Sequence, residues 1–222
     1  MTESVKSEPV IQAVKVTKYF GEDCVLKEAS LTLEKGEVCG IVGNNGSGKT
    51  VLMKCICGFI PMTSGVIRVQ GQEIGKETDF PQSLGVIIES PGFLTNMTGF
   101  RNLEILASMN RRITPAQIRI VLKKVGLDPD LKKSVAKYSL GMRQRLGIAQ
   151  AIMEDPGLLI LDEPFNGLDK HGVAEIRKIL LDLKAEGKSI LLASHNAEDI
   201  RILCDRVFEM DGGILRETGA AE

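Results

Sequence analysis

The amino-acid sequence predicts an α/β fold in which a mainly parallel sheet carries helices on both faces. Short apolar runs typical of buried strands, at 38–42 and 158–161, alternate with segments of helical periodicity. A glycine-rich turn at 43–50 joins the first of these runs to a helix. Residues 89–137 carry mainly helical patterns, so we expect an inserted helical part there.

The composition is that of an ordinary soluble globular protein. Its 222 residues are 43% hydrophobic and 26% charged, enough for one substantial core or a core with a small inserted subdomain. The net charge of −1 gives no global electrostatic reason to bind nucleic acid or an anionic membrane surface. No apolar run approaches the length of a bilayer span, and residues 1–9 lack the apolar core of a signal peptide, so we expect a cytosolic chain.

The cysteines are odd in number and scattered, which favours reduced and mostly buried thiols over a zinc site. They are Cys24, Cys39, Cys55, Cys57 and Cys204.

Two strands and two turns are expected before the apolar run 38–42. Residues 10–16 alternate as a half-buried strand, 29–33 form a second strand and 34–37 a turn. Residues 19–21, Tyr-Phe-Gly, are expected to form the other turn. Their aromatic side chains suit either the core or a platform on which a base stacks, and the residue types alone favour the core.

The glycine-rich turn has the P-loop pattern of a glycine, four residues and then Gly-Lys-Thr. A strand that leads through such a turn into a helix directs several backbone N–H groups at one point, where the helix dipole also favours negative charge. Phosphate is therefore the expected ligand. We expect Lys49 to reach the β- and γ-phosphates, Thr50 to bind magnesium, and the amides of 45–50 to surround the phosphate oxygens. The P-loop residues are Gly43, Asn44, Asn45, Gly46, Ser47, Gly48, Lys49 and Thr50.

Strands and helices alternate over the rest of the chain. In the insertion, Thr114 is a plausible N-cap and Pro115 a plausible first helical residue. The remaining expected elements are helix 51–58, strands 65–71 and 84–88, helices 99–111, 115–126, 142–154 and 173–186, strand 189–193, helix 197–204, and a hairpin of 206–210 with 214–217.

Asp162 and Glu163 follow the apolar run 158–161. In an open α/β sheet, ligands lie beyond the carboxyl ends of the strands, so both acids are expected to face the same crevice as the P-loop. Asp162 is placed to hold magnesium through water, and Glu163 to orient an attacking water. The alternative is that Asp-Glu-Pro merely turns the chain, and the P-loop upstream disfavours it.

Ser139 and Gly141 stand at the start of a helix, where backbone N–H groups attract anions. On these residues alone, Ser139 is by default an N-cap. The following Arg143 and Arg145 are expected to be solvated or paired.

The order of these motifs resembles the nucleotide-binding subunits of ATP-binding-cassette (ABC) transporters, over nearly all of residues 10–218. In the resemblance, 43–50 is Walker A, 158–163 is Walker B with Glu163 as the catalytic glutamate, and 139–141 is the signature. The D-loop is 166–169 and includes Asp169, the switch histidine is His195, and Phe20 occupies the position that stacks on adenine, with Tyr19 as the alternative. His171, just after the D-loop, is expected to be a surface residue.

The resemblance implies a P-loop NTPase core of the RecA-like type, with a mainly parallel sheet, an N-terminal antiparallel β subdomain and an inserted α-helical subdomain. Residues 1–222 would form one ABC ATPase domain, with 1–88 and 138–222 as the nucleotide-binding core and 89–137 as the helical subdomain. Two cassettes would pack head to tail, so that Ser139 and Gly141 serve the γ-phosphate of the partner's ATP. His195 would sense that phosphate, and Asp169 would contribute to the nucleotide site.

Two residues depart from the family pattern. Leu140 stands where the signature more often has glycine. Glu89 stands where the family has the Q-loop glutamine, and its carboxylate is a possible magnesium ligand that also adds negative charge near the γ-phosphate.

Residues 88–93, 97–103 and 138–142 resemble the subgroup that exports peptide antibiotics, including bacitracin resistance and lantibiotic self-immunity systems. This implies an ATPase subunit on the inner face of the cell membrane that drives a separate membrane permease, with ATP and Mg²⁺ as cofactors and no nucleic acid. Two alternatives remain. One is a soluble cassette ATPase acting on nucleic acid or the ribosome, and the other is a regulatory cassette that binds ATP with little turnover.

Overall fold

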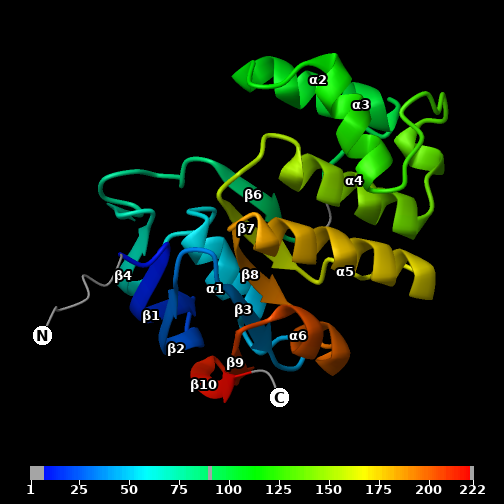
Figure 1. Cartoon of the computed structure of the whole chain (residues 1–222). Coiled ribbons are helices and arrows are strands. Elements are labelled where there is room, and N and C mark those ends of the chain that lie inside the picture. The colour runs from blue at the N-terminus through cyan, green and yellow to red at the C-terminus, as the bar shows by residue number, and fades with distance from the viewer. Residues whose placement is uncertain (1–7, 90–91, 221–222) are drawn as a thin grey trace, which may run out of the picture.

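The computed structural model describes residues 8–89 and 92–220 and confirms the predicted α/β fold (Figure 1). Ser90 and Pro91 of the subgroup motif lie outside the described residues. The strands are β1 (Ile11–Phe20), β2 (Asp23–Leu33), β3 (Val38–Val42), β4 (Ser64–Val69), β5 (Gln72–Glu73), β6 (Leu84–Ile87), β7 (Leu158–Asp162), β8 (Ser189–Ala193), β9 (Arg206–Asp211) and β10 (Ile214–Ala220). The helices are α1 (Lys49–Ile56), α2 (Gly99–Asn110), α3 (Pro115–Lys124), the 3-10 helix η1 (Val135–Lys137), α4 (Leu140–Ile152), α5 (Lys170–Ala185) and α6 (Ala197–Leu203).

A six-stranded sheet forms the centre of the described chain. Its strand order is β10-β9-β3-β8-β7-β6, and every neighbouring pair is parallel except β10 with β9. Because parallel strands point the same way, the carboxyl ends of β3, β7 and β8 lie at one edge of the sheet. The segments that follow these strands therefore meet there.

Each face of this sheet has its own hydrophobic core, because successive side chains of a strand point to opposite faces. Leu158 and Ile160 of β7 belong to the core formed with α1 and the antiparallel sheet. Leu159 and Leu161 belong to the core formed with α4, α5 and α6. Figure 1 shows α1 on one side of the sheet and α4 and α5 on the other. This arrangement confirms the prediction of helices on both faces.

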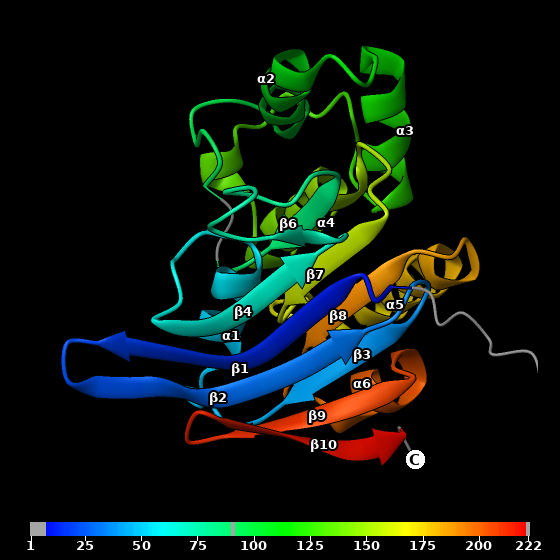
Figure 2. The ribbon, with the colours of Figure 1, turned by 90° about the vertical axis from the view of Figure 1, so that its left-hand side faces the viewer.

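The second sheet is antiparallel, with the order β2-β1-β4-β5. Of the predicted turn at 19–21, only Gly21 lies in a turn, because Tyr19 and Phe20 belong to β1 and pair with Cys24 and Asp23 of β2. The register of β1 is irregular in its middle, and β2 has an exposed polar face. Apolar and polar residues therefore do not alternate over the full length of either strand, so the predicted strands are too short. Figure 2 shows these two strands running side by side as a long hairpin.

Helix starts follow the capping side chains. Thr114 and Gln117 form a capping box at the start of α3, as the predicted N-cap implies. Helices α4 and α5 begin two and three residues before their predicted starts. Ser139 and Asp169 cap them by accepting hydrogen bonds from backbone N–H groups three residues on. In Figures 1 and 2, α2 and α3 lie beyond β6, at the opposite end of the sheet from β10.

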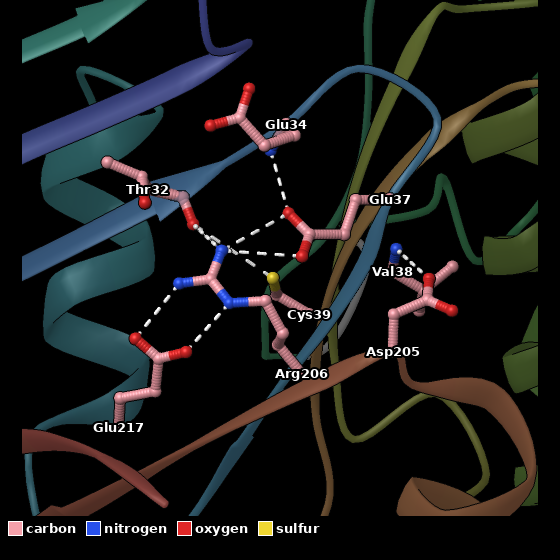
Figure 3. A network of polar contacts seen from close by, with 8 residues as sticks. All are labelled: Thr32, Glu34, Glu37, Val38, Cys39, Asp205, Arg206 and Glu217. Carbon is pink, nitrogen blue, oxygen red and sulfur yellow. Dashed lines mark hydrogen bonds and ion pairs between the residues drawn. The ribbon is translucent and has the colours of Figure 1, made fainter. Parts of the chain in front are cut away.

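Arg206 ties the C-terminal hairpin to the rest of the sheet (Figure 3). Its Nε and Nη2 donate to the carboxylate of Glu217 at 2.8 and 3.0 Å. Its Nη1 donates to the carboxylate of Glu37 at 3.3 and 3.4 Å and to the carbonyl oxygen of Thr32 at 3.4 Å. Glu37 also accepts the backbone N–H of Glu34 at 2.8 Å, which fixes the turn between β2 and β3. One guanidinium thus joins β10, β9 and the β2–β3 turn.

The cysteines are free thiols, and Cys39, Cys55, Cys57 and Cys204 are buried. Burial raises the pKa of Cys55 to about 11 and that of Cys57 and Cys204 to about 12, so these thiols stay neutral at physiological pH. Within residues 8–89 and 92–220, no helix has the length and apolar character that a bilayer span requires.

Candidate active site

A cleft of about 580 Å³ lies at the edge of the sheet where β3 and β7 end. Most of its wall comes from the P-loop, Glu89 and the residues that follow the apolar part of β7, as expected from the sheet topology. The lining residues are Val25, Asn45, Gly46, Gly48, Lys49, Thr50, Val51, Glu89, Leu140, Gln144, Asp162, Glu163 and Asn166.

Two glycines allow the backbone path of the P-loop. Gly43 has a φ of 148°, and a Cβ atom there would lie 2.2 Å from the carbonyl oxygen of Met210. Gly48 has a φ of 116° and is the N-cap of α1. Side chains other than hydrogen would strain both positions. The path brings the N-terminus of α1, whose first N–H groups have no partner within the helix, to the cleft.

Lys49 and Ser47 are buried within the loop, with 6% and 7% of their surface exposed. Lys49 Nζ donates to the carbonyl oxygens of Gly43 at 2.7 Å and Asn44 at 3.0 Å. Ser47 Oγ is buried and has no hydrogen-bond partner among the described residues. Buried hydroxyls in folded proteins are nearly always hydrogen-bonded. A phosphate oxygen held by the loop amides fits as the partner of this group.

Thr50 and Asp162 meet across the cleft although they are far apart in the sequence. Thr50 Oγ1 donates to Asp162 Oδ2 at 2.6 Å, and Asp162 is 8% exposed. An adjacent hydroxyl and carboxylate are the oxygen ligands that Mg²⁺ prefers, so the residues present fit this ion. Glu89, the third residue predicted to bind the metal, lines the same cleft, and its carboxylate forms an ion pair with Lys54.

Glu163 and His195 are brought together from the ends of β7 and β8. Glu163 has a φ of 50°, and its backbone N–H donates to the carbonyl oxygen of Ala193 at 2.9 Å. Glu163 Oε2 lies 2.8 Å from His195 Nδ1. Glu163 Oε1 is buried and has no hydrogen-bond partner among the described residues. The carboxylate therefore has one oxygen held by the histidine and one with unused hydrogen-bonding capacity.

Ser139 and Gly141 do not line the cleft of their own chain among the described residues, although Leu140 between them does. Ser139 Oγ accepts the N–H of Met142 at 3.2 Å, so in the single chain it acts as an N-cap. Leu140 is 62% exposed and packs on Gly167, where a Cβ atom would lie 2.4 Å from the Leu140 Cγ. In the single chain, the predicted signature therefore reaches the cleft through Leu140 and not through Ser139 or Gly141.

The two aromatic residues of β1 are exposed, Tyr19 by 46% and Phe20 by 48%. The core interpretation, which residue type alone favoured, is therefore wrong. Lys18 Nζ lies 4.9 Å from the centre of the Phe20 ring. An exposed ring at this position is available for stacking.

The charged residues expected at the surface are paired there. Arg145 forms an ion pair of 2.6 Å with Glu175, and His171 lies 3.2 Å from the same carboxylate. Arg143 donates to the carbonyl oxygen of Ala136 at 3.2 Å. None of these contacts requires a ligand.

Sequence reasoning missed three lining residues, Val25, Val51 and Gln144, and placed Asn166 only as a member of the D-loop. Gln144 Nε2 donates to the backbone carbonyl oxygen of Glu163 at 3.3 Å. The spacing of four between Leu140 and Gln144 on α4 is the signal that was available, because residues four apart share a helix face. Val25 lies in the part of β2 that the pattern failed to predict.

A P-loop that opens a helix, a threonine and aspartate pair, and a glutamate directly after β7 define a nucleoside-triphosphate-binding protein of the α/β class. Residues 26–166, more than half of the chain, match the ABC transporter family. The chain belongs to this family.

Known relatives narrow the class further. The chain is 40% identical over 218 residues to the bacitracin transport ATP-binding protein BcrA of Enterococcus faecalis, covering 97% of this chain and 71% of that protein. It is 35% identical over 209 residues to the lantibiotic transport ATP-binding protein SrtF of Streptococcus pyogenes, covering 94% and 90%. A solved dimeric ATP-binding cassette, in a post-hydrolysis state with ADP and Pi, shares the fold with a TM-score of 0.84 at 22% identity, covering 94% and 98%.

These matches confirm the resemblance to the bacitracin and lantibiotic subgroup. The chain is the ATP-binding and ATP-hydrolysing subunit of an ABC transporter. The relatives support this role and not the alternative of a soluble cassette that acts on nucleic acid or the ribosome.

Proposed function

We propose that this subunit energises the export of a peptide antibiotic or a similar amphipathic compound through a separate permease, in resistance or self-immunity. The relatives that are named for bacitracin and lantibiotic transport support this class of cargo. Glu89 supports it too, because it stands where the resembled subgroup usually has glutamate in place of glutamine. The subunit works as a peripheral protein on the inner face of the cell membrane.

The environment of Glu163 is the observation that carries the catalytic part of the proposal. Its Oε1 is buried without a partner among the described residues, while Oε2 faces His195. This oxygen has no competing hydrogen bond among the described residues, so it is able to accept a proton from a water that nucleotide binding brings within reach. Glu163 takes that proton while the water oxygen attacks the γ-phosphorus, and the bond from the γ-phosphorus to the bridging oxygen breaks, giving ADP and phosphate.

The other residues of the cleft bind and position the nucleotide. Lys49 and the amides of 45–50 neutralise the β- and γ-phosphates, and His195 donates from its second ring nitrogen to the γ-phosphate. The Phe20 ring stacks on adenine. Thr50, Glu89 and Asp162 would hold magnesium, which would offset the negative charge of the phosphate oxygens.

Two copies of the chain pack head to tail when ATP binds. Ser139 and Gly141 lie outside the cleft of their own chain, and this supports a role at the nucleotide of a partner chain. The N-terminus of α4, just after Ser139, is a favourable place for an anion. Asp169, which caps α5, is proposed to contribute to the same shared site. The dimeric cassette that shares the fold supports this arrangement.

A second groove, of about 440 Å³, supports the permease as partner. Phe59, Phe80 and Met109 line it and are exposed by 51%, 58% and 76%. Exposed apolar side chains that gather in a groove mark a protein contact. Strand β6 lines this groove up to Val86, and Glu89 in the cleft follows three positions later, so a permease segment seated here is close along the chain to the nucleotide site.

The test uses the tagged chain, purified in mild detergent from membranes of its host. A polytopic membrane protein should co-purify in stoichiometric amount. Phe80→Asp and Met109→Asp should lose it and keep nucleotide binding, whereas Ile120→Asp, at an equally exposed apolar residue of α3 outside the groove, should retain it. A wild-type chain that hydrolyses ATP but brings down no such protein would refute the transport proposal.

Cargo is tested by host sensitivity. A host in which the chain carries Glu163→Gln should become more sensitive to bacitracin or to a lantibiotic than the wild type. Unchanged sensitivity to both classes of compound would refute this choice of cargo. Low turnover by the wild-type chain in complex with its permease would instead favour the regulatory cassette.

A further inference from the structure

Lys54 and Glu89 form an ion pair at the wall of the cleft. Lys54 Nζ lies 2.6 Å from Glu89 Oε1, and the two side chains are 26% and 64% exposed. Glu89 follows β6 with a φ of 57°, a conformation that residues other than glycine adopt rarely. Lys54 lies on α1 four positions after Thr50, so both residues share a face of the helix. The lysine is thus one helical turn beyond the threonine that fits a metal ion.

The charges of the cleft show why a second cation matters. Among the residues that the structure describes, three carboxylates line it, Glu89, Asp162 and Glu163, against the single ammonium group of Lys49. A nucleotide polyphosphate would meet this excess of negative charge, and like charges at short range repel. The Lys54 ammonium offsets the carboxylate of Glu89, which is the most exposed of the three and the residue that departs from the family pattern.

The pair is also easy to separate. Ion pairs between exposed side chains contribute little free energy, because water and salt screen them. A divalent cation binds carboxylate oxygens more strongly than one ammonium group does at such a site. Glu89 is therefore able to leave Lys54 at small cost when a metal ion enters between Thr50 and Asp162.

We propose that Lys54 is a positioning residue that sets how strongly nucleotide binding depends on the metal ion. It neutralises Glu89 as long as the cleft holds no metal, and it releases the carboxylate to the ion that enters with the nucleotide. This inference rests on the proposed nucleotide and magnesium site. Removal of Lys54 weakens metal-free binding, because Glu89 is left uncompensated, and favours metal-bound binding, because Glu89 no longer has to leave a partner. Both effects increase the ratio of the Kd for nucleotide without metal to the Kd with metal.

The experiment measures that ratio by titration calorimetry. The probe is AMP-PNP, an ATP analogue that is not hydrolysed, and its Kd is determined with EDTA and with Mg²⁺. Lys54→Met should raise the ratio of the Kd in EDTA to the Kd in Mg²⁺ about fivefold, the size expected for the loss of one exposed ion pair. Lys54→Arg should behave as the wild type. Lys76→Met, which removes a lysine paired with Glu73 outside the cleft, is the matched control and should leave the ratio unchanged.

The Glu89→Gln variant tests whether Lys54 acts through the carboxylate of Glu89. In Glu89→Gln the ratio should no longer respond to Lys54→Met, because no carboxylate remains to be compensated. An equal response in both backgrounds, or an equal change of Kd with and without Mg²⁺, would overturn the proposal. If the wild type binds AMP-PNP but the Kd ratio does not respond to Lys54→Met as expected, the nucleotide site is supported and the proposed role of Lys54 is refuted. If the wild type fails to bind AMP-PNP at all, the proposed site itself is refuted.

Discussion

Glu163→Gln separates catalysis from binding in this cleft. Glutamine keeps the size of the side chain but has one oxygen in place of two. That oxygen is able to face either His195 Nδ1, now at 2.8 Å from Glu163 Oε2, or the buried position of Oε1, and an amide NH₂ group then occupies the other. In both arrangements the proton acceptor is lost. We expect kcat to fall by about 10²- to 10⁴-fold, the usual contribution of a general base, which corresponds to roughly 3–5 kcal/mol in the barrier.

The assay is steady-state phosphate release with Mg²⁺ and ATP, together with the Kd for AMP-PNP. Nucleotide affinity should change by less than about threefold, because Glu163 contributes no hydrogen bond to the P-loop among the described contacts. The variant should also accumulate a dimer with ATP in size-exclusion chromatography. Glu186→Gln, at an exposed carboxylate beyond the end of α5, is the matched control. The reasoning would be refuted by a kcat within threefold of the wild type, or by a loss of affinity as large as the loss of rate.

Three further outcomes are expected. Lys49→Ala should weaken AMP-PNP binding on the order of 10- to 100-fold in calorimetry, because it removes a buried charge-assisted donor; an unchanged Kd would contradict its role. Phe20→Ala should weaken binding by about tenfold if the ring stacks on adenine, whereas Tyr19→Ala should not, and the opposite order would transfer the role to Tyr19. Arg206 lowers the pKa of Glu217, so the pair stabilises the fold above the unfolded-state pKa of this carboxyl and loses that contribution as pH falls through the lowered folded-state value. The difference in urea midpoint between wild type and Glu217→Gln should therefore shrink between pH 6 and pH 3, and a difference that grows would contradict the assignment.

Local patterns were sufficient for most elements on the parallel sheet. Strands β3 and β8 match the predicted ranges, because a strand buried on both faces is a continuous apolar run bounded by turns. Helix α3 was also predictable, since Thr114 and Pro115 mark its start by capping and by a fixed φ. The P-loop was recognisable because the backbone conformation of the loop requires glycines, and this requirement is local.

The antiparallel sheet was harder to predict. Only one face of β1 and β2 is buried and β1 has irregular register, so the apolar alternation breaks before the strands end. For Phe20, only the family resemblance, which places it at the position that stacks on adenine, favoured an exposed ring. Residue type alone predicted burial, whereas the pairing of Phe20 with Asp23 at the end of a hairpin leaves the ring in solvent.

The sequence by itself determined which residues are chemically able to act. Residue type and spacing, which encode local backbone path and functional groups, indicate the P-loop, Asp162 and Glu163, and the family resemblance adds His195. Only the tertiary structure decided which of them meet. Thr50 reaches Asp162 across 112 positions of sequence, and Glu163 reaches His195 across 32, because β7 lies next to β8 and ends at the same edge as β3. The ion pair of Lys54 with Glu89 has the same origin, since no local preference links α1 to the end of β6.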